Sequence, residues 1–269
     1  METILTTRPL PAPRTARAVH AGPNATLVER QAVSRTVVRL RVRPDGPVPD
    51  FIPGQYLTLG VDVDGRPLQR PYSTASARGE SYALEFLVRL VDGGALTPRL
   101  WRLRVGDRVH LGHPKGLFTT DPTEDRRPVY VATGTGIAPL RSMLESRLTE
   151  RSDGPAGSRP VIVHGVARAE DLAYRERLGA LAYQRRITYV PAVSRPDDPA
   201  NAGWDGLTGR VASLLPGILA ELEADPGVTV AYVCGNPGMT EAATAALTAW
   251  GMPDEAVRSE AYWVAAAPA

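Results

Sequence analysis

The hydrophobic pattern changes near the middle of this chain, and that change limits the fold more than any other sequence feature. In the first half, apolar and charged residues alternate in short runs, as in residues 38–43, and Gly or Pro separates the runs. Several short alternating strands at close spacing are typical of a small antiparallel barrel. In the second half, short apolar runs alternate with helical segments. That pattern indicates a doubly wound parallel sheet.

The expected elements follow this division. Strands are expected at residues 32–42, 56–63, 82–89 and 109–111, with a hairpin partner after the Asp64-Gly65 turn. Thr97 as an N-cap and Pro98 at the first helical position predict a helix that reaches Leu103. In the second half, strands at 129–132, 160–165, 187–190 and 228–235 alternate with helices at 139–148, 170–183, 211–222 and 238–250.

A polar, proline-flanked stretch at residues 121–128 marks the boundary between the halves. We therefore expect an α+β protein of two domains: an antiparallel β-barrel at 23–124, followed by a doubly wound parallel α/β domain at 125–269. Residues 1–22 are expected to form a disordered or loosely packed tail.

Composition and charge exclude several classes of protein. The 31 basic and 29 acidic residues leave a net charge of +2, which gives no case for binding nucleic acid. No run reaches the length of about 18 apolar residues needed to span a membrane, and the N-terminus lacks the apolar core of a secretory signal. We therefore expect a cytoplasmic bacterial protein without membrane attachment.

Cys234 is the single cysteine. One cysteine excludes an intramolecular disulfide, and it excludes an iron–sulfur cluster held by four thiolates of this chain. The four histidines are not spaced as metal ligands, so no metal site is expected.

Arg70, Pro71, Tyr72 and Ser73 form the first candidate site. An arginine binds phosphate, a tyrosine stacks against an aromatic ring, and a serine hydrogen-bonds a polar ring edge. Arg70 and Tyr72 point to the same face of a strand, so one ligand that is both anionic and aromatic would contact both. A strand end with a solvated arginine and a packed tyrosine explains the four residues equally well.

Two glycine-rich turns form the second candidate site. Gly134, Thr135 and Gly136 follow an apolar strand and precede a helix, where glycines and free amides favour a pyrophosphate. Ala138 and Pro139 stand where a full Gly-x-Gly-x-x-Gly motif has its third glycine, and a tight strand-to-helix turn is the alternative. The second turn, from Cys234 through Met239, ends the last strand expected in the parallel sheet. Both turns would therefore face one crevice at the carboxyl ends of the strands.

The order of these segments resembles the ferredoxin–NADP reductase family, and most closely its bacterial ferredoxin or flavodoxin reductases. The resemblance covers roughly residues 30–263. Six segments carry it in order: 70–73, 85–89, 93–100, 134–139, 234–237 and the aromatic C-terminal segment. It implies that FAD binds to the barrel and NADP(H) to the α/β domain. NADPH would deliver hydride to FAD, and the reduced flavin would pass single electrons to a small redox protein.

The resemblance also implies a role for individual residues. Tyr72 would pack on the isoalloxazine ring, Ser73 would lie near the flavin nitrogen that accepts hydride, and Cys234 would lie near the reacting nicotinamide carbon. The residues expected to bind FAD are Arg70, Pro71, Tyr72, Ser73, Phe86, Leu87, Val88, Gly94, Leu96 and Thr97. The residues expected to bind the nicotinamide nucleotide are Thr135, Gly136, Gly235, Asn236 and Met239. The expected catalytic residues are Tyr72, Ser73, Cys234, Glu260 and Tyr262.

Three arginines resemble those that bind the 2′-phosphate of NADPH in bacterial members: Arg168, Arg195 and Arg210. Each is also typical of a solvated surface charge. Near the C-terminus, Tyr262 would cover the flavin face that receives nicotinamide, Trp263 would contact the adenine side, and Glu260 would transfer a proton. The chain departs from the pattern with a terminal aromatic residue, because six residues follow Trp263. An ordinary terminal strand is the alternative.

The expected electron acceptor is an acidic ferredoxin or flavodoxin, which Arg66, Arg70 and Lys115 would attract towards the flavin edge of a monomer. Two other functions stay open. One is a reductase component that serves an oxygenase or cytochrome P450 and needs a separate iron–sulfur partner. The other is a non-catalytic flavoprotein that senses redox state.

Overall fold

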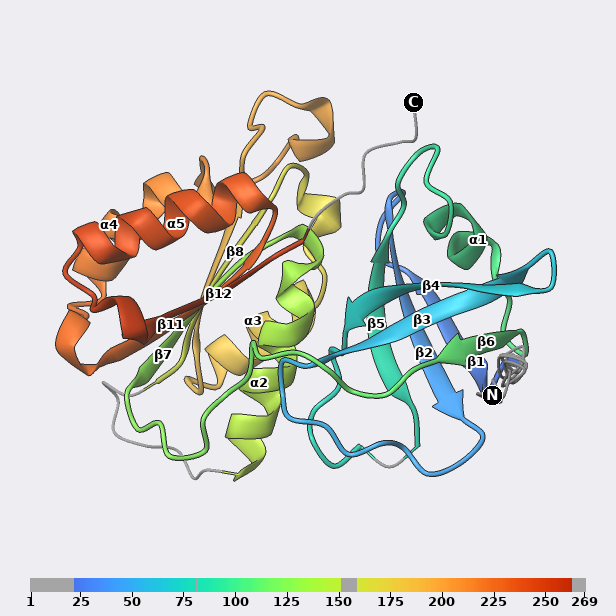
Figure 1. Cartoon of the computed structure of the whole chain (residues 1–269). Coiled ribbons are helices and arrows are strands. Elements are labelled where there is room, and N and C mark those ends of the chain that lie inside the picture. The colour runs from blue at the N-terminus through green and yellow to red at the C-terminus, as the bar shows by residue number, and fades with distance from the viewer. Residues whose placement is uncertain (1–21, 81, 151–158, 263–269) are drawn as a thin grey trace, which may run out of the picture.

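The computed structural model describes residues 22–80, 82–150 and 159–262, which form two domains that pack side by side (Figure 1). Trp263 and the expected N-terminal tail, apart from Gly22, lie outside these residues. No helix among the described residues is long and apolar enough to cross a membrane.

The N-terminal domain is an antiparallel sheet of six strands in the order β4-β3-β6-β1-β2-β5. A bridge between Thr74 and Phe86 joins the two outer strands, and the amide of Ala75 donates to the carbonyl of Glu85 at 2.8 Å. The sheet therefore closes on itself, and the expected barrel is confirmed. Its elements are β1 (Ala25–Ala32), β2 (Val37–Pro44), β3 (Tyr56–Val63), β4 (Arg66–Ser73), β5 (Leu84–Arg89), α1 (Thr97–Arg102) and β6 (Arg108–Leu111).

Two local expectations for the barrel are wrong. The strand expected at 32–42 is divided, because the Ser34 hydroxyl accepts from the amides of Thr36 and Val37, each at 3.1 Å, and closes a turn between β1 and β2. Helix α1 is capped by Leu96, and Thr97 is its first residue. The Thr97 hydroxyl bonds instead to the amide of Val91 at 3.0 Å.

The C-terminal domain is a parallel sheet of six strands in the order β10-β9-β8-β7-β11-β12. Its strands are β7 (Arg127–Thr133), β8 (Val161–Val166), β9 (Thr188–Val193), β10 (Leu207–Thr208), β11 (Thr229–Gly235) and β12 (Val257–Ala261). Its helices are α2 (Ile137–Glu150), α3 (Arg175–Tyr183), α4 (Val211–Glu221) and α5 (Pro237–Ala249), with short 3-10 turns η1 (Gly134–Gly136), η3 (Ala169–Asp171), η4 (Pro199–Asn201), η5 (Pro226–Val228) and η6 (Asp254–Ala256).

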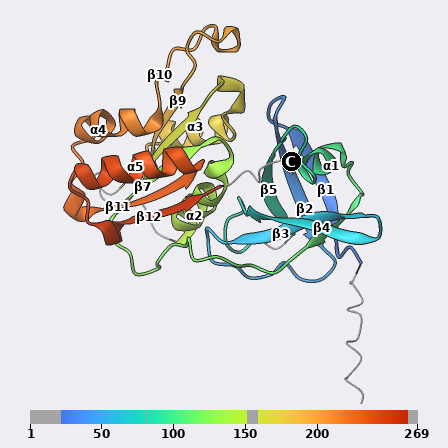
Figure 2. The ribbon, with the colours of Figure 1, turned by 45° about the horizontal axis from the view of Figure 1, so that its top comes forward.

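Helices cover both faces of this sheet, which confirms the doubly wound fold. Side chains alternate along β7: Tyr130 and Ala132 belong to the cluster with α2 and α3, whereas Val129 and Val131 belong to the cluster with α4 and α5. Figure 2 shows α4 and α5 on the side away from the barrel. The strand order reverses at β7, whose neighbours are β8 and β11. In such sheets, ligands bind beyond the carboxyl ends of the strands at this reversal.

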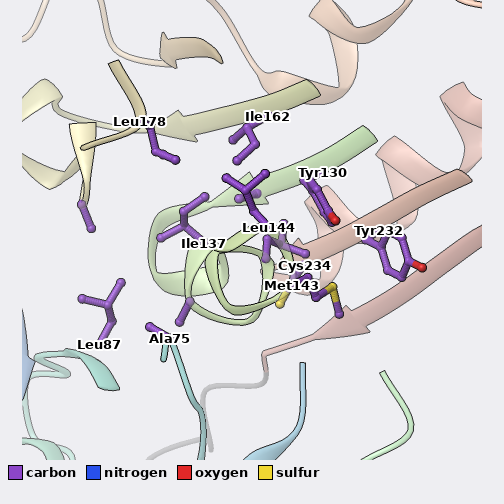
Figure 3. Packing of buried hydrophobic residues seen from close by; sticks show 14 of the residues in the cluster. Ala75, Leu87, Tyr130, Ile137, Met143, Leu144, Ile162, Leu178, Tyr232 and Cys234 are labelled. Atoms are coloured by element: carbon purple, nitrogen blue, oxygen red, sulfur yellow. The ribbon is translucent and has the colours of Figure 1, made fainter. Parts of the chain in front are cut away.

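Helix α2 joins the domains, because it packs on the sheet and also against the barrel. Met143 and Leu144 of α2 share one buried cluster with Ala75 and Leu87 of the N-terminal domain (Figure 3). Arg141 of the same helix adds polar contacts, donating to the carbonyl of Ala75 at 2.7 Å and to the Glu85 carboxylate at 3.0 Å. The carboxyl ends of β7 and β11 are thereby held at the junction of the domains.

Candidate active site

The two glycine turns lie against each other at the carboxyl ends of β7 and β11. A Cβ atom on Gly136 would lie 2.2 Å from the Cys234 carbonyl oxygen, and a Cβ on Gly235 would lie 2.2 Å from the Thr133 hydroxyl. Neither position therefore accepts a side chain without movement of its neighbour. The two turns that the sequence predicts to face one crevice are therefore in direct contact. Glycine at these two positions is what allows the turns to pack this closely.

Asn236 shapes the second turn. Its side-chain oxygen accepts from the Met239 amide at 3.0 Å and caps α5, while its side-chain nitrogen donates to the Thr133 hydroxyl at 3.3 Å. The expected nucleotide residues Thr135, Gly136, Gly235, Asn236 and Met239 thus all lie in these two turns and the helix starts that follow them.

His164 supports the first turn through a hydrogen bond to its backbone. Its ring is fully buried on β8, and Nε2 lies 3.1 Å from the carbonyl oxygen of Gly134, where φ is 53°. Burial lowers the pKa of His164 from 6.5 to about 4. The ring is therefore neutral at physiological pH, and its Nε2–H donates to Gly134.

Ser73, Glu260 and Tyr262 converge from distant segments. The Tyr262 hydroxyl donates to the Ser73 hydroxyl at 2.8 Å, and the Ser73 hydroxyl donates to the Glu260 carboxylate at 3.3 Å. The amide of Tyr262 donates to the carbonyl of Gly235 at 2.7 Å, which continues the pairing of β12 with β11. The Cys234 thiol is buried beside the Tyr262 hydroxyl. Four of the five expected catalytic residues thus form one polar cluster between the domains.

Burial controls the protonation of this cluster. It raises the pKa of Cys234 far above its usual range and that of Tyr262 well above 10.0, so both groups are protonated at neutral pH. A buried thiol of this kind is a packing group rather than a nucleophile. Burial also raises the pKa of Glu260, although the hydrogen bond from Ser73 opposes the shift. Glu260 therefore keeps its proton to a higher pH than an ordinary carboxyl group does.

Arg70 and Tyr72 differ in exposure although both lie on β4. Tyr72 packs against the barrel core, and burial raises its pKa to about 12, while the charge of Arg70 lowers it. The Arg70 guanidinium is exposed and donates to the Gln69 carbonyl at 2.8 Å. Tyr72 is thus a neutral ring beside an accessible cation, which fits a ligand with both an aromatic and an anionic part.

The remaining expected FAD residues fall into two groups. Phe86 and Val88 are fully buried in the barrel core, and Leu87 is buried in the cluster that the two domains share. Gly94 lies in a tight turn before α1, since a Cβ there would lie 2.9 Å from the Val91 carbonyl oxygen. The N-terminus of α1 has no side-chain cap, and its amides fit a phosphate.

Arg168, Arg195 and Arg210 each lie two residues beyond a strand end, at β8, β9 and β10. These strands are parallel neighbours, so the three arginines share the sheet edge that carries the first glycine turn. Asp198 lies beside these arginines, although no sequence feature indicated it. Its carboxylate accepts a hydrogen bond from Nε of Arg168 at 2.8 Å.

Comparison with known proteins agrees with this geometry. Residues 24–120 match the family model of an oxidoreductase FAD-binding domain, and residues 130–245 match that of an oxidoreductase NAD-binding domain. Ferredoxin–NADP reductase B of Sorangium cellulosum is 36% identical over 197 residues, which cover 72% of this chain and 77% of that protein.

Two solved structures are also similar. A cytochrome P450 reductase from Amycolatopsis is 27% identical with a TM-score of 0.76, covering 89% of this chain and 69% of that one. A ferredoxin–NADP reductase from Neisseria gonorrhoeae, solved with bound FAD and NADP, is 25% identical with a TM-score of 0.74, covering 88% and 97%. The barrel, the paired glycine turns and these relatives together establish that the chain belongs to the ferredoxin–NADP reductase family of FAD-dependent, nicotinamide-dinucleotide-binding oxidoreductases.

Proposed function

We propose that this protein is a ferredoxin/flavodoxin–NADP(+) reductase, which transfers electrons between NADPH and a one-electron carrier. One observation carries the proposal: the Ser73–Glu260–Tyr262 cluster lies at the domain junction beside the two glycine turns. Bound FAD supplies the exchange between a two-electron hydride and single electrons. The protein supplies binding, orientation and proton control.

The two domains contribute residues with different roles. In the barrel, Tyr72 packs against the aromatic ring of the flavin, Arg70 pairs with its pyrophosphate, and the N-terminus of α1 binds phosphate. In the α/β domain, the glycine turns bind the nicotinamide nucleotide. Cys234 would lie near the reacting nicotinamide carbon, and Ser73 holds Glu260 in position to exchange a proton.

The proposed acceptor is an acidic ferredoxin or flavodoxin in the cytoplasm. Arg66, Arg70 and Lys115 are all exposed on the barrel. Their charges favour encounter with an acidic partner at low ionic strength.

A second candidate acceptor is the iron–sulfur partner of an oxygenase or cytochrome P450. The similarity to the Amycolatopsis cytochrome P450 reductase favours it. Since this chain has one cysteine, the iron–sulfur cluster would reside in a separate protein.

Anaerobic stopped-flow spectroscopy tests whether the protein is a reductase or a redox sensor. The FAD-loaded protein is mixed with NADPH or NADH, and the reduced protein is then mixed with ferredoxins and flavodoxins from the same genome. We expect NADPH to bleach the flavin and a ferredoxin or flavodoxin to restore its colour. Bound flavin that neither nucleotide reduces would contradict the proposal and support a redox sensor. Failure to bind FAD would contradict both functions.

A further inference from the structure

Asp198 is placed among cations at the edge of the nucleotide site. Its Oδ2 accepts from Nε of Arg168 at 2.8 Å, and its Oδ1 accepts from the Ala200 amide at 3.0 Å. The Asp198 side chain is only 17% exposed and that of Arg168 is 36% exposed. The Ala200 amide, Arg168 and Arg195 all lower the pKa of Asp198, so this carboxylate is charged at neutral pH.

Asn201 holds this arrangement in place. It is buried, and its side-chain oxygen accepts from the Ala169 amide at 2.8 Å. Its side-chain nitrogen donates to the carbonyls of Ala167 and Arg195 at 3.0 and 2.7 Å. One amide thereby joins the loops that follow β8 and β9. These bonds hold the backbone on either side of Arg168 next to the backbone of Arg195, so the Asp198–Arg168 pair lies in an ordered loop.

We infer that Asp198 is a specificity-determining residue of the nucleotide site, which lowers the preference for NADPH over NADH. The inference rests on the proposed function, because it assumes that the three arginines receive the 2′-phosphate. A 2′-phosphate that approaches Arg168 meets a cation already paired with a carboxylate, and the two anions repel each other. A free ribose 2′-hydroxyl instead donates a hydrogen bond to a carboxylate. Asp198 thus opposes the binding of NADPH and favours the binding of NADH.

The variant Asp198→Asn removes the charge but keeps an oxygen that accepts from the Ala200 amide. Asp197→Asn is the matched control: it makes the same charge change one residue away, and Asp197 is exposed without a hydrogen bond or ion pair among the described residues. The readouts are calorimetric binding of 2′-phospho-AMP and of AMP to the FAD-loaded protein, and kcat/KM for flavin reduction by NADPH and NADH.

We expect Asp198→Asn to tighten 2′-phospho-AMP binding roughly two- to fivefold, as for a partly exposed charge pair, and to raise the NADPH/NADH ratio of kcat/KM by a similar factor. AMP binding should stay the same or weaken, and Asp197→Asn should change each quantity by less than about twofold. In an Arg168→Ala background, the effect of Asp198→Asn should largely disappear, since the two residues act as a pair.

Three results would overturn the inference: unchanged 2′-phospho-AMP affinity in Asp198→Asn, an equal gain in Asp197→Asn, or a gain that persists without Arg168. If instead the proposed function is wrong, neither NADPH nor NADH reduces the flavin of the unmodified protein. The calorimetric titration still reports in that case whether Asp198 opposes the binding of a 2′-phosphate.

Discussion

His164 couples the protonation of one buried ring to the stability of the whole fold. Its pKa is about 4 in the native protein, against an ordinary value of 6.5 once the ring is exposed to water in the unfolded chain. Between these values the unfolded state binds more protons, so the free energy of unfolding falls as pH decreases from 6.5 towards 4. At a pH well below 4, the total loss of unfolding free energy through His164 reaches roughly 3 kcal/mol.

Replacing His164 with Gln should remove this pH dependence. The unmodified protein should lose about 2 kcal/mol of unfolding free energy through this group between pH 7 and pH 5, and His164→Gln should not. Urea denaturation at the two pH values measures the difference. His113→Gln is the control, because His113 is exposed. Parallel pH profiles for the unmodified protein and His164→Gln would show that His164 does not titrate in this way.

At the scale of elements, Tyr174 explains why helix α3 begins later than the sequence predicts. Helical periodicity favoured residues 170–183, whereas α3 begins at Arg175 because Tyr174 has a φ of 63°. This left-handed conformation is unusual for a large residue. The Tyr174 hydroxyl donates to the Glu85 carboxylate of the barrel at 2.7 Å, and the guanidinium of Arg141 lies 4.6 Å from the centre of its ring. A contact between domains thus overrides the local preference for helix.

The variant Tyr174→Phe should destabilise the protein, because it leaves the buried Glu85 carboxylate without one of its donors. We expect a loss of about 1 to 3 kcal/mol in unfolding free energy, measured by urea denaturation. Tyr183→Phe is the matched control, since the Tyr183 side chain is 91% exposed. Equal stability of the two variants would contradict a role for this hydrogen bond in joining the domains.

Regular periodicity predicted most elements, and the exceptions have local causes. Strand β1 was missed because a bulge between Leu27 and Glu29 interrupts its alternation. Strand β10 has only two residues, both exposed.

In the site, the glycine turns were predictable because each lies directly between a strand and a helix. The contacts of Ser73 with Glu260 and Tyr262 span 187 and 189 residues, so only the family resemblance brought these residues together. No resemblance indicated Asp198, whose position depends on the turn that Asn201 stabilises.

At the scale of the whole molecule, the C-terminal strand connects the domains across the candidate active site. Strand β12 pairs with β11 at the edge of the parallel sheet, and Tyr262 follows it. The Tyr262 hydroxyl then reaches Ser73 at the end of β4 in the barrel. We therefore expect a nicotinamide ring that approaches Ser73 and Cys234 to displace the Tyr262 side chain, at a cost in binding energy.

Deleting Tyr262 and all later residues should remove that cost. We expect the truncated, FAD-loaded protein to show a stronger charge-transfer absorbance between nicotinamide and flavin on mixing with NADPH, and tighter nucleotide binding. The control is a deletion that begins at Val264, which retains Tyr262 and Trp263 and should behave like the full chain. Spectral titration and stopped-flow reduction measure both effects. If deletion from Tyr262 leaves the spectra and kinetics unchanged, Tyr262 does not cover the nicotinamide position. If deletion from Val264 has the same effect as deletion from Tyr262, the residues after Trp263 control access instead.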